Sequence, residues 1–183
     1  DHDHHSHELD EHVWTDPANA IKIVKKLTKV LSELDPANAD FYQENSEKYT
    51  AKLAKLDQDY KEMVANAKRD TIIVGDRFPF RYLVEAYGLK YFAAFPGCST
   101  EGDASPQTLV FLIDKVKEEQ IPVVFHIEMS NMKMAESIAD ATGAEIMLLH
   151  GAHNISKEDF ENGLSYLAIM SNNLENLRHA LND

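Results

Sequence analysis

Residues 71–88 read TIIVGDRFPFRYLVEAYG, a short β-branched run followed by a helical run that ends in glycine. TIIVG (71–75) predicts a buried strand, and PFRYLVEAYG (79–88) predicts a helix closed by its glycine. This alternation continues, so the chain is expected to have an α/β fold with a mostly parallel four-stranded sheet flanked by helices. The remaining expected strands are 90–95, 122–128 and 145–149, and the remaining expected helices are 105–120, 131–143 and 156–181.

Two further helices are expected ahead of this sheet. Thr15-Asp16-Pro17 is typical of a helix start, with a capping side chain followed by proline in the first turn. Asp35-Pro36 ends that helix and begins a second one over roughly residues 37–67. A helix of that length reaches about 40 Å or more, which suits either a coiled-coil arm or a rigid strut between two lobes. The first helix carries its apolar residues at a helical period, at Ile21, Val24, Leu27, Leu31 and Leu34.

The chain begins DHDHHSHELDEHVW (1–14), in which histidines alternate with acids. Its apolar content is too low for independent folding, so we expect a flexible loop or tail. Three interpretations are open: a purification tag, a solvated tail, or a loop that collects metal ions. In the third, the loop ligands are His2, His4, His5 and His7.

The overall composition restricts the class of partner. The 183 residues carry a net charge of −13, which argues against nucleic acid, because binding to phosphates needs a basic patch. The single cysteine, Cys98, excludes an internal disulfide and is expected to be a small packed residue. No signal peptide or membrane-spanning run is present, and the absence of an initiator methionine suggests a processed or cut chain.

Acids and histidines gather where the expected strands end. Ligands of open α/β sheets bind beyond the carboxyl ends of the strands. Imidazole and carboxylate together favour a divalent metal over covalent catalysis, and neither a glycine-rich phosphate loop nor a GxSxG elbow is present. The candidate residues at these strand ends are Asp76, His126, Glu128, His150 and His153.

Each candidate also has a structural interpretation. Asp76 can be a turn residue or a partner of Arg77, and Glu128 can cap the following helix. His126 lies within a strand and is expected to be a core or supporting residue. His179 is expected to face outward and to complement a helix dipole.

The segment DEHVWTDPANAIKIVKKLTKVLSELDPANADFYQENSEKY (10–49) resembles the zinc/manganese substrate-binding proteins of bacterial ABC importers, the cluster A-I or zinc-uptake family. GDRFPFRYLVEAYGL (75–89) resembles the start of that family's second lobe, and GCSTEGDASPQTLVFLIDKVKE (97–118) resembles the strand, loop and helix that follow. The resemblance covers essentially the whole chain and is most specific in the first 50 residues.

The resemblance implies an extracytoplasmic, non-catalytic receptor that captures Zn²⁺, or alternatively Mn²⁺, and delivers it to ABC permease subunits. It implies contact with the membrane only through a lipid anchor on the full-length protein. It also implies that most of a first lobe is missing. The corresponding segments are an acidic His-rich metal loop (1–14), the last helix of the first lobe (15–35), a long interlobe helix (36–69) and a C-terminal α/β lobe (70–183).

The same resemblance implies a set of metal ligands. His12 matches the motif histidine that is a primary ligand, and Asp76 is the nearest candidate where the family has its second-lobe ligand. His150 falls at or near the family's last ligand, an acid, and His153 is a further candidate. A histidine of the missing lobe would complete a four-ligand site, and histidine in place of the acid favours zinc over manganese. Affinity should fall below about pH 6.5, the value for free histidine.

Other functions stay open at this stage. The chain can be a manganese receptor or a metal buffer unlinked to transport, and members of the family have also been labelled adhesins. A metal-dependent hydrolase is the alternative from another class. It would need a general base beside an open metal position, for which Glu128 is the candidate.

Overall fold

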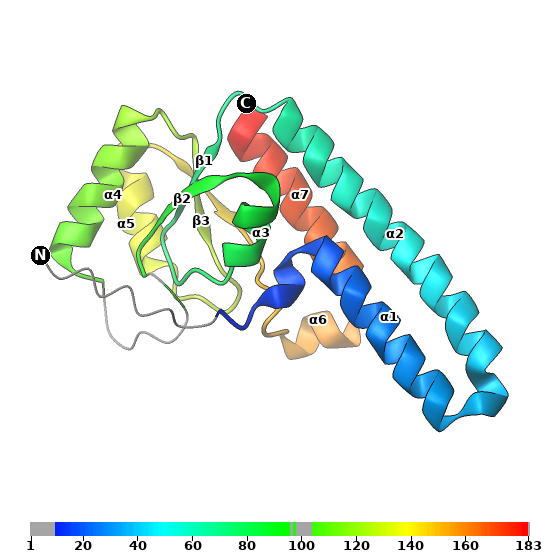
Figure 1. Ribbon diagram of the computed structural model, residues 1–183. Helices are drawn as coiled ribbons and strands as arrows, with labels where there is room; N and C mark the ends of the chain where they lie inside the picture. Colours follow the sequence, from blue (N-terminus) through cyan, green and yellow to red (C-terminus); the bar gives the residue numbers. More distant parts are fainter. Residues whose placement is uncertain (1–9, 96, 98–103, 183) are drawn as a thin grey trace, which may run out of the picture.

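The computed structural model describes residues 10–95, 97 and 104–182 (Figure 1). Four strands form one sheet in the order β2-β1-β3-β4, and all neighbouring strands are parallel. Ile73 at the centre pairs with Phe92 on one side and Val124 on the other. The predicted α/β fold with a four-stranded parallel sheet is therefore confirmed. The strands are β1 Thr71–Val74, β2 Lys90–Ala93, β3 Val123–His126 and β4 Glu145–Leu148.

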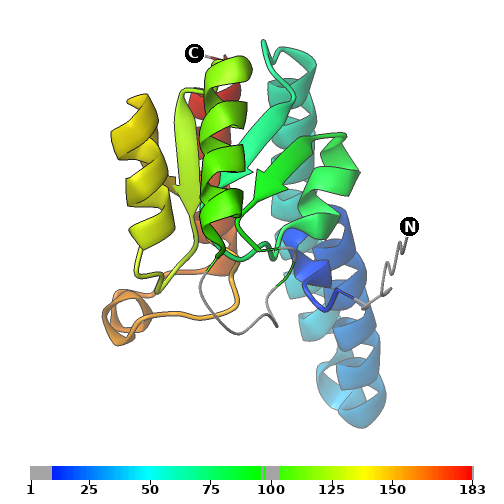
Figure 2. The ribbon, with the colours of Figure 1, turned by 90° about the vertical axis from the view of Figure 1, so that its left-hand side faces the viewer.

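Helices cover both faces of this sheet, and Figure 2 shows α4 and α5 together on one face with α7 on the other. Ile73 and Val124 pack beneath α4 and α5. Ile72 and Phe125 face the opposite way, toward α2, α3 and α7. Strand residues alternate between faces, so neighbouring apolar residues serve two separate core clusters. These helices are α2 Ala39–Ala65, α3 Arg81–Tyr87, α4 Pro106–Glu118, α5 Lys133–Thr142 and α7 Tyr166–Asn182.

The helix ends follow the local sequence signals. The Ser105 hydroxyl accepts the Thr108 amide at 3.1 Å and starts α4, with Pro106 in the first turn. Gly88 and Gly143 end α3 and α5 with φ values of +67° and +79°, a conformation that glycine adopts without a steric cost.

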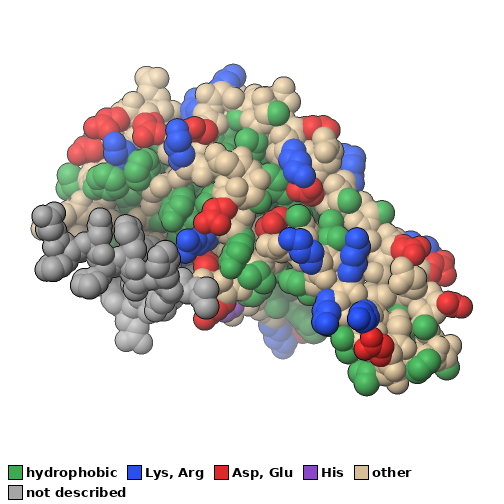
Figure 3. Space-filling view, in the orientation of Figure 1, with side chains coloured by type: hydrophobic (Ala, Val, Ile, Leu, Met, Phe, Trp, Pro, Cys, Tyr) green, Lys and Arg blue, Asp and Glu red, His purple; other side chains and the backbone are tan. Residues whose placement is uncertain are grey.

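Two antiparallel helices extend away from the sheet as an arm (Figure 1). Helix α1 spans Pro17–Leu34, and a single 3₁₀ turn, η2 Pro36–Asn38, connects it to α2. The 27 residues of α2 span about 40 Å, which confirms a long helix. Figure 3 shows hydrophobic side chains at the surface near the free end of this arm. The exposed apolar residues of the arm are Ile23, Leu27, Val30, Leu31, Leu34 and Phe41. None of the described helices is both long and apolar enough to cross a membrane.

The last predicted helix is wrong in one respect. Residues 156–181 do not form one continuous helix but two, α6 Lys157–Glu161 and α7. Gly163, at a φ of +72°, separates them, and the Ser165 hydroxyl accepts the amide of Ala168 near the start of α7. Phe160, in α6 before this break, has a side chain that is 72% exposed.

Candidate metal-binding site

His12 is a buried histidine held by a neighbouring carboxylate. It precedes the 3₁₀ turn η1 Val13–Thr15, and only 3% of its surface is exposed. The Asp10 Oδ1 atom accepts the His12 backbone amide at 2.8 Å and lies 2.9 Å from the ring Nδ1. An ionised carboxylate only accepts hydrogen bonds, so Nδ1 carries the proton and Nε2 presents a lone pair. A histidine in this tautomer is ready to bind a metal ion through Nε2.

His153 meets this lone pair from the loop after β4. The His12 Nε2 and His153 Nδ1 atoms are 3.1 Å apart, although the two residues are separated by 141 positions. Because His12 Nε2 accepts, His153 Nδ1–H is the donor in this structure. Two nitrogens on one tetrahedral zinc, each about 2.0–2.1 Å from the ion, stand roughly 3.3 Å apart. The observed separation is therefore close to that of two zinc ligands.

Trp14 connects the two histidine segments. Its ring lies edge-on to His12 and to His153, with centroid distances of 5.3 and 6.2 Å. Its Nε1–H donates to the Gly151 carbonyl at 3.0 Å, and the Tyr166 hydroxyl donates to the Trp14 carbonyl at 2.7 Å. The segment before α1 and the loop after β4 are thus joined beside the histidine pair.

Glu128 organises the loop that carries His153. Its carboxylate accepts the backbone amides of Gly151, His153 and Asn154 at 2.7, 3.1 and 3.2 Å. Burial alone would raise the pKa of Glu128, but backbone hydrogen bonds to the carboxylate outweigh it and lower the pKa from its ordinary value. Glu128 was considered a cap of the following helix. This interpretation is wrong, because the carboxylate binds the loop after β4 instead.

His150 is buried, and its ring is engaged by its own loop. The Ala152 amide donates to His150 Nδ1 at 2.9 Å. The Asn173 side chain accepts the His150 amide and donates to the His150 carbonyl, both at 2.8 Å. His150 therefore lies at the strand end, as expected, but its Nδ1 lone pair is already used by a backbone donor.

Asp76 lies after β1 and is engaged by other groups. Its carboxylate accepts the Arg77 amide at 2.8 Å and a short hydrogen bond from the Ser130 hydroxyl. Asp76 as a metal ligand therefore stays a prediction. Across residues 10–95, 97 and 104–182, no group of three or more His, Cys, Asp or Glu side chains is arranged to hold a metal ion.

The other singled-out residues have local partners or are not described. The half-buried His126 donates from Nδ1 to the Ile127 carbonyl at 2.9 Å. His179 Nε2 lies 2.9 Å from a Glu145 carboxylate oxygen. The expected loop ligands His2, His4, His5 and His7, together with Cys98, lie outside the described residues.

Sequence reasoning missed three supporting residues, Asp10, Trp14 and Asn173. Asp10 and His12 both lie in the segment that resembles the family, but the role of Asp10 as the partner of the His12 ring Nδ1 was not inferred. Asn173 gave no signal, because an asparagine within a helix pattern does not indicate which distant backbone it will contact.

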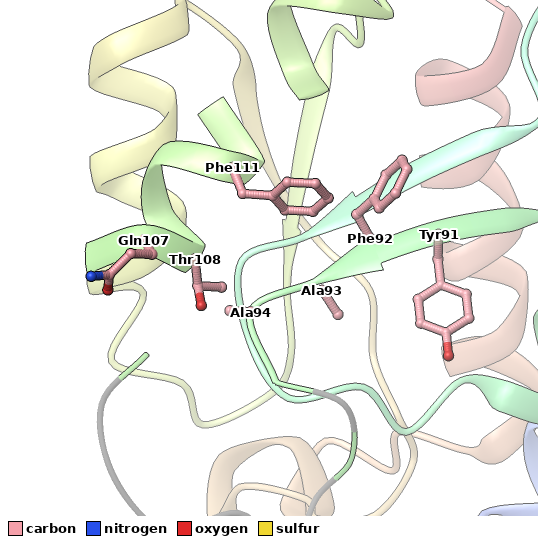
Figure 4. Close-up of a pocket in the computed structure, with 7 residues that line it drawn as sticks. All are labelled: Tyr91, Phe92, Ala93, Ala94, Gln107, Thr108 and Phe111. Atoms are coloured by element: carbon pink, nitrogen blue, oxygen red, sulfur yellow. The ribbon is translucent and has the colours of Figure 1, made fainter. Parts of the chain in front are cut away.

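A separate groove of about 640 Å³ lies between the edge strand β2 and helix α4 (Figure 4). Among the described residues, its lining contains no carboxylate, imidazole or thiol, the donors that zinc prefers. The lining residues are Tyr91, Phe92, Ala93, Ala94, Gln107, Thr108 and Phe111.

Comparison with known proteins shows the family of this chain. The profile of a family described as zinc-uptake complex component A, periplasmic, matches residues 1–180. This chain belongs to that family. It is 35% identical over 176 residues to the high-affinity zinc uptake system protein ZnuA of Bacillus subtilis, an alignment that covers 96% of the chain and 54% of the relative. The chain thus spans about half the length of this relative.

Two solved structures of the family share the fold. The Zn(II)-bound ZnuA-like domain of Streptococcus pneumoniae AdcA has a TM-score of 0.80 at 29% identity, covering 95% of this chain and 64% of that domain. The laminin-binding protein Lbp of Streptococcus pyogenes has a TM-score of 0.79 at 29% identity, covering 94% and 64%. The resemblance noted in the sequence is confirmed.

Proposed function

We infer that this chain takes part in capturing Zn²⁺ outside the cytoplasm for delivery to the permease subunits of an ABC importer, with His12 and His153 as its metal ligands. One observation carries this proposal. Two imidazole nitrogens from distant segments converge to 3.1 Å, and one of them is backed by a carboxylate. The zinc-related names of the relatives and the family description support zinc as the cargo.

The donor set favours zinc over harder ions. Imidazole nitrogen suits zinc, whereas manganese in proteins prefers carboxylate and carbonyl oxygen. The arrangement of Asp10, His12 and metal would reproduce the carboxylate–histidine–zinc pattern that fixes a ligand's tautomer. Binding requires His153 Nδ1 to lose its proton, either to solvent or by transfer of the proton to Nε2. Zinc would then replace the hydrogen bond between the two rings.

Two ligands are fewer than the four that a closed zinc site uses. The proposal assigns the remaining positions to side chains outside the described residues, including a histidine of an additional lobe in a longer polypeptide. Asp76 remains a candidate only if its bonds to Ser130 and Arg77 rearrange.

The proposed division of the chain follows from the same reasoning. Residues 1–14 are assigned to metal collection, 15–35 to a first lobe, 36–69 to the connection and 70–183 to the second lobe. The apolar surface of α1 supports this division, because a helix that buries few of its own apolar residues is suited to packing against a further domain. Anchoring through a lipid on the full-length protein belongs to this proposal as well.

Isothermal titration with ZnCl₂ and MnCl₂ tests the proposal. The titrated background carries His2→Asn, His4→Asn, His5→Asn and His7→Asn, which removes the competing imidazoles of the N-terminal run. In this background, His12→Ala and His153→Ala should each weaken zinc binding by tenfold or more, an order typical for loss of a ligand's function. His179→Ala, a histidine paired with Glu145, is the matched control and should bind zinc as the background does. Unchanged zinc binding in His12→Ala would remove the basis of the proposal.

The hydrolase alternative has no supporting observation. Its candidate base, Glu128, has a lowered pKa, and both of its oxygens accept backbone amides. A carboxylate held in this way is a weak proton acceptor and is not free to approach a metal-bound water.

A further inference from the structure

We propose that Glu128 and His150 are positioning residues, which hold the loop of residues 150–154 so that His153 faces His12, and that neither is itself a metal ligand. This inference rests on the proposed function, because it explains how one of the two proposed ligands, His153, is held so that it faces His12. It differs from the sequence-based expectation, in which His150 was a ligand and Glu128 a base or a helix cap.

Glu128 binds the backbone of this loop from inside the protein. Its side chain is only 8% exposed, and it accepts three backbone amides within four consecutive residues, at Gly151, His153 and Asn154. One of these amides belongs to His153 itself. The carboxylate therefore fixes the backbone from which the candidate ligand projects.

Gly151 lies close to both Pro79 and Glu128. A Cβ atom at Gly151 would lie 3.0 Å from Pro79 Cγ and 3.4 Å from both carboxylate oxygens of Glu128. A side chain at this position would therefore be tight against Pro79, while the Gly151 amide donates to Glu128 at 2.7 Å.

The loop also contains a backbone conformation that needs support. Ala152 has a φ of +54°, a left-handed conformation that costs free energy for any residue with a Cβ. Its amide is held by His150 Nδ1 at 2.9 Å. Since Glu128 holds the residues on either side, His150 and Glu128 together stabilise the turn that presents His153.

The position of the proton on the His150 ring argues against His150 as a metal ligand. Neutral imidazole has one proton, and because Nδ1 accepts from Ala152, that proton is on Nε2. Binding metal through Nε2 would require the loss of this proton and would leave an imidazolate, or would require the Ala152 amide to turn away. Metal-binding histidines instead donate from the second nitrogen, as His12 does to Asp10.

The base of the loop is fixed independently. Asn173, 1% exposed, forms two hydrogen bonds with the His150 backbone. The Trp14 indole donates to the Gly151 carbonyl at 3.0 Å. Because these contacts hold the start of the loop without the Glu128 or His150 side chains, loss of either side chain should change the orientation of His153 more than the fold.

Zinc titration of five variants tests this inference in the background that lacks the four N-terminal histidines. Asparagine at position 150 offers an Oδ1 near the place of the imidazole Nδ1, whereas alanine offers no acceptor. We expect His150→Ala and Glu128→Gln to weaken zinc binding about 10- to 100-fold, the range for supporting partners of metal ligands, and His150→Asn to stay within about threefold of the background. Glu136→Gln, an exposed acid of α5, is the matched control, and His12→Ala reports on the proposed function itself.

The outcomes separate the two claims. If His150→Asn loses as much affinity as His150→Ala, the imidazole binds the metal and the positioning role is wrong. If Glu128→Gln and His150→Ala both bind zinc as the background does, the loop needs no such support. If His12→Ala keeps full affinity, the proposed function fails, whatever the loop variants do. Circular dichroism of each metal-free variant establishes that it is folded at the titration temperature, and Glu128→Gln and His150→Asn decide the matter if His150→Ala does not fold.

Discussion

The indole of Trp14 donates a hydrogen bond to the carbonyl oxygen of Gly151, across 3.0 Å and 137 positions of sequence. This bond joins the segment that carries His12 to the loop that carries His153. It lies beside the two imidazoles and is continued by the hydroxyl of Tyr166, which binds the Trp14 carbonyl. The segments of the two candidate ligands are therefore connected by the hydrogen bond of Trp14 as well as by the contact between the two imidazoles.

Removing the hydrogen bond between Trp14 and Gly151 should lower the free energy of unfolding. Trp14→Phe keeps an aromatic ring but leaves the Gly151 carbonyl without its donor, so we expect a loss of about 1–2 kcal/mol in the free energy of unfolding. Urea denaturation measures this loss. Tyr91→Phe, which removes a hydroxyl from a partly exposed ring, is the control and should change stability by less than about 0.5 kcal/mol. Equal effects of the two variants would show that the indole hydrogen bond contributes nothing.

Trp14 should also report metal binding directly. It is the single tryptophan of the chain, and its ring lies within about 6 Å of both imidazoles. Replacing the hydrogen bond between the histidines by a zinc ion changes the charge next to the indole, so its emission should shift or change in intensity during a zinc titration. His12→Ala should abolish this change. A full response in His12→Ala would place the metal elsewhere.

Asn173 should be one of the most sensitive positions of helix α7. Its buried amide accepts from the His150 amide and donates to the His150 carbonyl. Asn173→Ala leaves both backbone groups unpaired in the interior, which should cost about 2–4 kcal/mol of unfolding free energy. Asn172→Ala, an exposed neighbour, is the matched control for thermal or urea unfolding. A cost below that of the control would mean that water replaces the amide without penalty.

The acid stability of the protein should depend on Glu128. Its pKa lies below the ordinary value of 4.5, so the ionised carboxylate stabilises the fold above that pH, and this stabilisation is lost as the pH falls through the folded-state pKa. Glu128→Gln should therefore be less stable than the parent at neutral pH, by about 1–3 kcal/mol. The difference should shrink below pH 4.5. Unfolding curves between neutral and acid pH measure it, with Glu136→Gln as control, and a difference that is independent of pH would contradict this role.

Local patterns in the sequence predicted most of the fold. The β-branched run at 71–75, the Thr15-Asp16-Pro17 helix start and the glycine at 88 predicted a strand and two helix ends, because each signal acts within a few residues. The break at Gly163 was missed, because the apolar spacing on either side of it continues a helical period.

The candidate site was only partly predictable. The motif around His12 and the strand ends indicated which residues gather at one edge of the sheet. The sequence did not reveal that His150 and His153 have different roles, because the difference lies in which ring nitrogen is already bonded. That depends on Ala152, Asp10 and a tight turn, which only the three-dimensional structure brings together.

An anomalous difference map at the zinc edge, from crystals of this chain grown with zinc, shows directly whether His12 and His153 bind the ion. We expect one zinc ion about 2.0–2.1 Å from both His12 Nε2 and His153 Nδ1, with Asp10 still bound to His12. A zinc ion coordinated by His150, with the hydrogen bond between His12 and His153 intact beside it, would show that His12 and His153 are not the ligands.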